Sequence, residues 1–125
     1  MAEVVVASGI LAVVASGLFG TVIMARHMIG TAQLHNEAQM IVMDKIWEVF
    51  QQDYNDLLNY DNPDTEAVSS DSLLHPYGGT LRSWALNYGD YIYIFVRVDW
   101  NQPMLRNGST AVHESAAMYR FRSQR

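Results

Sequence analysis

The chain has 125 residues, which is enough for one domain at most. It contains no cysteine, so disulfide bonds and thiolate metal sites are excluded. Its formal net charge of −5 argues against nucleic acid as a partner, because a polyanion prefers a basic surface.

The charges are unevenly distributed along the chain. Residues 37–71 carry nine acidic side chains and a single base, Lys45, whereas residues 82–125 carry six arginines and three acids. These two segments could meet within one subunit or between subunits, and it is also possible that both are simply solvated.

An apolar segment opens the chain. Residues 4–25 are 22 consecutive positions without a charge, and Arg26 ends the run. As a helix they would be about 33 Å long, enough to cross a hydrocarbon core of about 30 Å. The run is preceded by Glu3 and exceeds the roughly 7–15 apolar residues of a signal peptide. We therefore expect a retained membrane helix over residues 1–26.

Small residues recur within this segment: Ser8, Ala12, Ser16 and Gly20 at intervals of four, with Gly9 and Gly17 beside them. Such residues let helix backbones approach closely in lipid, so we expect these positions to pack against other copies. The alternative is that Gly, Ala and Ser are merely common in membrane helices. For Glu3, the alternatives are an interfacial acid that reaches water and a pair with the α-amine of a neighbouring subunit.

A helical pattern continues through residues 27–58, which contain no proline. One face carries apolar residues at spacings of four and three: Met43, Trp47, Phe50, Tyr54 and Leu57. We therefore predict a single helix over residues 3–58, roughly 80 Å long.

The remaining chain has loop and strand patterns. Residues 59–79 are rich in Asn, Asp, Pro, Ser and Gly, which predicts a connecting loop. Strands are predicted at 80–88, 91–100 and 111–122, with a long hairpin connection at 101–109. In the clearest strand, the residues expected to face the Trp47, Phe50 and Tyr54 stripe are Ile92, Ile94, Val96, Val98 and Trp100. The alternating residues Tyr91, Tyr93, Phe95, Arg97 and Asp99 should face outward. The predicted fold class is therefore α+β: a long N-terminal helix against a small antiparallel sheet of about three strands, within residues 80–125.

Residues 3–19, Glu-Val-Val-Val-Ala-Ser-Gly-Ile-Leu-Ala-Val-Val-Ala-Ser-Gly-Leu-Phe, resemble the N-terminal segment of type IV pilins and type II secretion pseudopilins. Residues 93–100, Tyr-Ile-Phe-Val-Arg-Val-Asp-Trp, are similar to the strand before the final hairpin in minor pilins and pseudopilins. In that family a glutamate begins an apolar helix that continues into an amphipathic half covered by a small sheet. The resemblance implies that Glu3 acts in subunit assembly and that Met1 is the processed, methylated residue. Glu3 stands closer to Met1 than is usual there, and the family's proline within the apolar half is missing.

The resemblance also implies partners and a location. It predicts a helical homo-oligomer, an inner-membrane assembly machinery, and membrane residence before assembly. The assembled filament would be extracellular, or a periplasmic pseudopilus.

The sequence contains few motifs that indicate other functions. The four histidines are scattered, and no phosphate-binding glycine loop, Gly-x-Ser-x-Gly or His-Glu-x-x-His motif occurs. We therefore expect no catalytic, cofactor or metal site. Arginines at 97, 106, 120, 122 and 125, with Tyr119 and Phe121 between them, could form a basic patch for DNA or pair with a neighbour's acidic helix. Asn107 begins a glycosylation triplet that also has the composition of a turn.

These features favour a structural subunit of a pilus-like or pseudopilus filament, assembled by packing of the apolar helices. The alternatives are a monomeric, single-span membrane-anchored binding module and a minor pseudopilin of a secretion or DNA-uptake system. A tethered module would gain reach from a flexible linker after residue 26, and no linker composition is present there.

Overall fold

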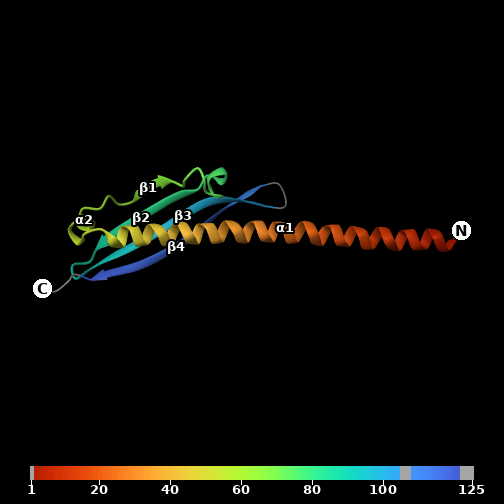
Figure 1. The fold of residues 1–125 in the computed structure, drawn as a ribbon, viewed down its shortest axis with the longest axis horizontal. Coiled ribbons are helices and arrows are strands. Elements are labelled where there is room, and N and C mark those ends of the chain that lie inside the picture. The colour runs from red at the N-terminus through yellow and green to blue at the C-terminus, as the bar shows by residue number, and fades with distance from the viewer. Residues whose placement is uncertain (1, 105–107, 122–125) are drawn as a thin grey trace. The chain divides into compact units, whose positions relative to one another are not determined.

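A computed structural model describes residues 2–104 and 108–121, and Figure 1 shows its helices and strands. Two units are distinguished along the chain, divided between Gln33 and Leu34. The second unit is called the head below. The elements in order are α1 (Ala2–Gln51), α2 (Tyr54–Leu58), β1 (Asp64–Ala67), the short 3-10 helix η1 (His75–Tyr77), β2 (Thr80–Asn87), β3 (Tyr91–Pro103) and β4 (Ser109–Phe121). The predicted α+β class is confirmed, with four strands in place of about three.

The first unit is the N-terminal part of α1. This helix is the one candidate membrane span among the described residues, being long and apolar enough to cross a bilayer. Its apolar side chains are exposed throughout, Val4 at 72% and Phe19 at 71%.

The head contains one antiparallel sheet with the strand order β1-β2-β3-β4. Pairing of Leu81 with Val98 sets the register of β2 on β3, and pairing of Ile94 with Met118 sets that of β4. The two long strands extend further than predicted, since β3 continues to Pro103 and β4 begins at Ser109. Asn107 and Arg106 lie outside the described residues, as do Arg122, Arg125 and Met1.

β1 lies within the segment that was predicted to be only loop, so that prediction was wrong there. Its sequence, Asp-Thr-Glu-Ala, has little strand propensity. The strand forms because it pairs with β2, from Asp64 opposite Ser83 to Ala67 opposite Thr80. Backbone hydrogen bonds to β2 thus stabilise a strand that local propensity does not predict. Two residues before β1, the Asn62 side chain accepts from the Ala85 amide at 2.8 Å and donates to the Ala85 carbonyl at 2.9 Å.

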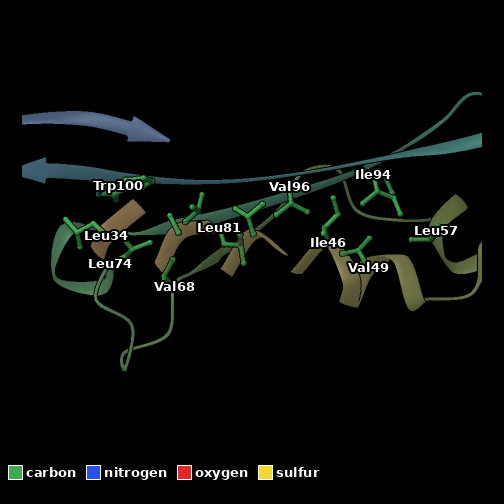
Figure 2. Close-up of a cluster of buried hydrophobic side chains, with 14 of the residues drawn as sticks. Leu34, Ile46, Val49, Leu57, Val68, Leu74, Leu81, Ile94, Val96 and Trp100 are labelled. Atoms are coloured by element: carbon green, nitrogen blue, oxygen red, sulfur yellow. The ribbon is translucent and has the colours of Figure 1, made fainter. Parts of the chain in front are cut away.

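The hydrophobic core lies between the head portion of α1 and one face of the sheet (Figure 2). β3 contributes Ile92, Ile94, Val96, Val98 and Trp100, all at most 2% exposed. In Figure 2, Trp100, Leu34 and Leu74 gather at one end of this core, while Ile94, Val49 and Leu57 gather at the other. The alternation of β-branched residues along β3 thus turns one full side of the strand toward the helix.

The helix stripe that meets the sheet differs from the predicted one. The residues of α1 that are buried against the sheet are Leu34, Ala38, Val42, Ile46 and Val49. Trp47 is 47% exposed and Met43 is 46% exposed, while Phe50 and Tyr54 pack only against the edge of the core. Ala38 is fully buried, although it has almost no side chain. The predicted core role of Trp47 was therefore wrong, because the neighbouring stripe of smaller residues is the one that is buried.

The predicted single helix to residue 58 was also wrong. α1 ends at Gln51, and Asp53 takes an extended conformation before α2 begins at Tyr54. The Asp53 side chain makes no capping hydrogen bond; its backbone carbonyl accepts from the Asp56 and Leu57 amides at 3.0 and 3.1 Å and so begins the new turn. The break places Leu57 in the core at 1% exposed and lets the Tyr54 hydroxyl donate to the Gly89 carbonyl at 3.2 Å.

Candidate assembly surfaces

The apolar surface of α1 in the first unit has no cover among the described residues. Exposed fractions of large apolar side chains there lie between 50% for Val22 and 74% for Val13. A monomer in water rarely exposes so much contiguous apolar surface, so the segment requires lipid or other protein around it.

Hydroxyl groups in this apolar segment are satisfied inside the helix. Ser8 donates to the Val5 carbonyl at 2.9 Å, Ser16 to Ala12 at 2.7 Å, and Thr21 to Leu18 at 2.8 Å. Polar groups in hydrocarbon must find such partners within their own segment. The helix can therefore enter an apolar environment without leaving these donors unpaired.

No contact within one copy requires glycine at the glycine positions of this segment. A Cβ placed on Gly9, Gly17 or Gly20 would meet nothing within 4 Å. Glycine also weakens a helix by about 1 kcal/mol relative to alanine. Ser8, Ala12 and Ser16 belong to the same segment. Together with the three glycines they form a strip of small residues, here called the small-residue strip, which leaves the helix backbone accessible.

Glu3 lies in the first turn of α1, where the helix dipole stabilises a carboxylate. Within residues 2–104 and 108–121 it has no hydrogen-bond or ion-pair partner. The carboxylate is thus available for a contact outside its own copy.

In the head, one ion pair and one hydrogen bond link α1 to the edges of the sheet. Lys45 of α1 lies 2.9 Å from Glu66 of β1 and 3.4 Å from Glu48. His35 Nδ1 lies 2.8 Å from the Glu114 carboxylate of β4, and the His35 ring meets Trp100 edge-on at 5.1 Å. Burial opposes the charge on Lys45, but Glu66 and then Glu48 outweigh it and raise the pKa of the ammonium above its ordinary value.

A groove of about 540 Å³ runs between α1 and the segment around β1. Its charged lining residues are Glu37, Asp44, Lys45, Glu48, Glu66 and Asp71. Lys45 neutralises part of this negative charge through its two ion pairs. Among the described residues, no group of three or more His, Asp or Glu side chains is arranged to hold a metal ion.

The sheet face opposite the helix is aromatic. Six side chains, here called the aromatic face, are in mutual ring contact along β2, β3 and β4: Trp84, Tyr91, Tyr93, Phe95, Tyr119 and Phe121. Tyr88 stacks on Tyr91 at 5.3 Å. Phe121 is 72% exposed and Tyr119 is 56% exposed, so the cluster is open to solvent at β4. Arg97 lies beside it and is paired with Asp99 at 2.6 Å.

Sequence reasoning located the apolar segment but missed the links that fasten the head together. His35 and Glu114 are 79 positions apart, and no local pattern signals their contact. The outward direction of Tyr91, Tyr93 and Phe95 could be predicted from alternation, and the contribution of Tyr119 from β4 needed the strand register.

The fold and these surfaces define a class: an α+β protein with one helix able to cross a membrane and a head built on an antiparallel sheet. The chain has no significant match among protein-family models, curated proteins or solved structures.

Proposed function

We propose that this chain is a structural subunit of a pilus-like or pseudopilus filament, whose interior is a bundle of the apolar helices. The observation that carries the proposal is the uncovered apolar surface of α1 before residue 34. Lipid covers that surface before assembly, and helices of other copies cover it afterwards. Because both surroundings are apolar, the exchange costs little free energy.

Three further features support assembly over simple anchoring. The strip of small residues from Ser8 to Gly20 offers a close approach that one copy does not use. Glu3 has a carboxylate available at the start of the helix, where a neighbour's α-amine would neutralise it. The residues after Arg26 are helical and do not form the flexible linker that a tethered binding module would use. The role is structural, without a catalytic step.

The substitution Glu3→Ala tests the assembly role. We expect the variant to enter the membrane normally, because its apolar segment is unchanged, and to form few or no filaments. Membrane fractionation measures insertion, and negative-stain electron microscopy measures filaments. Asp71→Ala, which removes an exposed carboxylate from the head, is the matched control and should assemble normally. Abundant filaments from the Glu3 variant would contradict the pairing of Glu3 with a neighbour.

The substitution Gly17→Leu tests the small-residue strip. A leucine there fits open space within one copy, so the fold and insertion should be retained. Helix packing between copies should weaken because the backbones are held apart. The control Val14→Leu changes a side chain that is already large. Equal assembly of both variants would contradict a packing role for the small residues, and a parent chain that forms no filaments would favour the alternative, a monomeric membrane-anchored module.

A further inference from the structure

The head has two exposed apolar surfaces, one on α1 and one on the sheet. The outward stripe of α1 consists of Met40, Met43 and Trp47, which are 63%, 46% and 47% exposed. Met43 and Trp47 follow the buried Val42 and Ile46 by one position, which places them about 100° around the helix, and Met43 lines a small pocket beside Ala116 of β4. The aromatic face is on the side of the sheet away from the helix. Neither surface can therefore cover the other within one copy.

The charges beside these two surfaces are opposite in sign. Glu37 and Asp44 follow one edge of the outward stripe, three and four positions from Met40, whereas Glu48 is paired with Lys45. Beside the aromatic face, Arg82 of β2 pairs across the sheet with Arg97 of β3, next to the pair of Trp84 and Phe95. Asp99 neutralises Arg97, whereas the Arg82 side chain is exposed. The aromatic face thus has a positive end, while the outward stripe has a negative edge.

We propose that the aromatic face of one copy packs on the outward stripe of the next copy, with Arg82 close to Asp44 of that copy. Aromatic and methionine side chains are the residues most enriched at protein interfaces, and opposite charges at the rim set the orientation. Because the two surfaces are different, the contact is head-to-tail and can repeat from copy to copy. The inference rests on the proposed function, since it supplies the contact between heads in the same assembly.

The occupant is a second copy because the two surfaces complement each other in both hydrophobicity and charge. A different partner on the aromatic face would leave the outward stripe exposed. A contact of the aromatic face with itself would leave Arg82 without an acid of the outward stripe.

The absence of native cysteine permits a direct test by single-cysteine cross-linking of the full-length chain. Met40→Cys and Tyr119→Cys variants are prepared separately, mixed in phosphatidylcholine vesicles and oxidised, and disulfide-linked dimers are quantified. Both positions are exposed, so the fold should tolerate the changes. The mixture should give several-fold more dimer than either variant alone. It should also exceed a mixture of Met40→Cys with Ser70→Cys, an exposed loop position outside both surfaces.

Charge reversal provides a second readout of the same contact. Arg82→Glu, introduced into the Tyr119→Cys variant, should lower the dimer yield several-fold. Asp44→Arg in the Met40→Cys partner should restore it, because the opposite charges then face each other again. An equal yield in all mixtures would overturn the proposal and mean that something else covers these surfaces. Dimers from Tyr119→Cys alone that equal those of the mixture would overturn it as well, in favour of a symmetric contact.

An Ala12→Cys variant distinguishes failure of this inference from failure of the proposed function. Ala12 belongs to the small-residue strip, so its dimer reports packing of the apolar helices. Strong Ala12 dimers without the Met40–Tyr119 dimer overturn the head contact and leave the helix bundle intact. The reverse pattern supports the head contact and contradicts the helix bundle.

Discussion

Arg120 of β4 donates a hydrogen bond to the backbone carbonyl of Phe50 in the last turn of α1, and its guanidinium carbon lies 5.5 Å from the centre of the Phe50 ring. The same guanidinium donates to the carbonyl of Gln52. The last carbonyls of a helix have no partner within it, and cations stabilise that end of the dipole. Since α1 has no basic residue in its own last turn, a residue from β4 supplies the charge.

The substitution Arg120→Met should lower the free energy of unfolding of the head by about 1.5–3 kcal/mol, because hydrogen bonds from a charged donor are lost. Arg120→Lys should lose less, since one ammonium keeps the charge but lacks the planar guanidinium. Thermal unfolding in detergent, followed by near-ultraviolet circular dichroism, measures the change. Arg82→Met is the matched control, because its side chain is exposed. Equal losses in the Arg120→Met and Arg82→Met variants would show that the contact with α1 has no stabilising role.

Two adjacent residues of α1 should differ sharply in their contribution to stability. Ile46 is 1% exposed in the core, whereas Trp47 is 47% exposed and touches Phe50 edge-on at 5.7 Å. Ile46→Ala should cost about 2–5 kcal/mol because it leaves a cavity. Trp47→Ala should cost about 1 kcal/mol or less, as expected at the surface. Chemical denaturation of both variants measures the difference, and a larger loss for Trp47→Ala would contradict the orientation of α1.

This pair of residues also shows how far the sequence could predict the fold. Apolar residues recur on two neighbouring faces of α1, one through Val42 and Ile46 and the other through Met43 and Trp47. Periodicity predicts a helix in either case, and residue size favoured the aromatic stripe as the core. The sheet decided between them, because it covers the face through Ala38, Val42 and Ile46 and leaves Met43 and Trp47 about half exposed. On β3, by contrast, Ile92 to Trp100 form a single apolar side, so alternation alone predicted their burial.

The candidate assembly surfaces also differ in how far the sequence could predict them. The apolar segment and its small residues are local patterns, and they could be predicted before any tertiary contact was known. The aromatic face required the register that sets Tyr119 opposite Tyr93 and Phe121 opposite Tyr91. The links of Arg120 and His35 to their partners join residues far apart in the chain, for which the sequence holds no local signal.

Tyr60 and Ser83 should show energetic coupling. Their hydroxyl oxygens are 2.6 Å apart, and Ser83 is 1% exposed within the core face of β2. Tyr60→Phe should cost about 1–3 kcal/mol because it leaves the buried Ser83 hydroxyl without this partner. Adding Ser83→Ala should recover part of that loss, since both polar groups are then gone. Unfolding of the two single variants and the double variant measures the coupling, with Tyr88→Phe as an exposed control. Strictly additive losses would mean that the two hydroxyls do not interact.

Alkaline solution should destabilise the head through two groups. The pKa of Lys45 is raised, because Glu66 and Glu48 together outweigh the opposing effect of burial. The pKa of Tyr60 is raised mainly by burial, although the hydrogen bond with Ser83 works against it. Ordinary values for both groups are about 10. Where a folded-state pKa exceeds the unfolded one, the unfolded chain releases its proton first as the pH rises. The stabilisation is therefore complete below about pH 10 and is lost as the pH rises through the two raised values.

Melting temperatures between neutral pH and pH values above about 10 should accordingly stay flat and then fall. Lys45→Gln and Tyr60→Phe should each be less stable than the parent chain at neutral pH, and each should show a shallower alkaline decline, because one of the two titrating groups has been removed. The double variant should be the flattest of the series. Tyr88→Phe removes an exposed tyrosine and should reproduce the parent profile. A decline of unchanged steepness in the double variant would place the alkaline sensitivity in other groups.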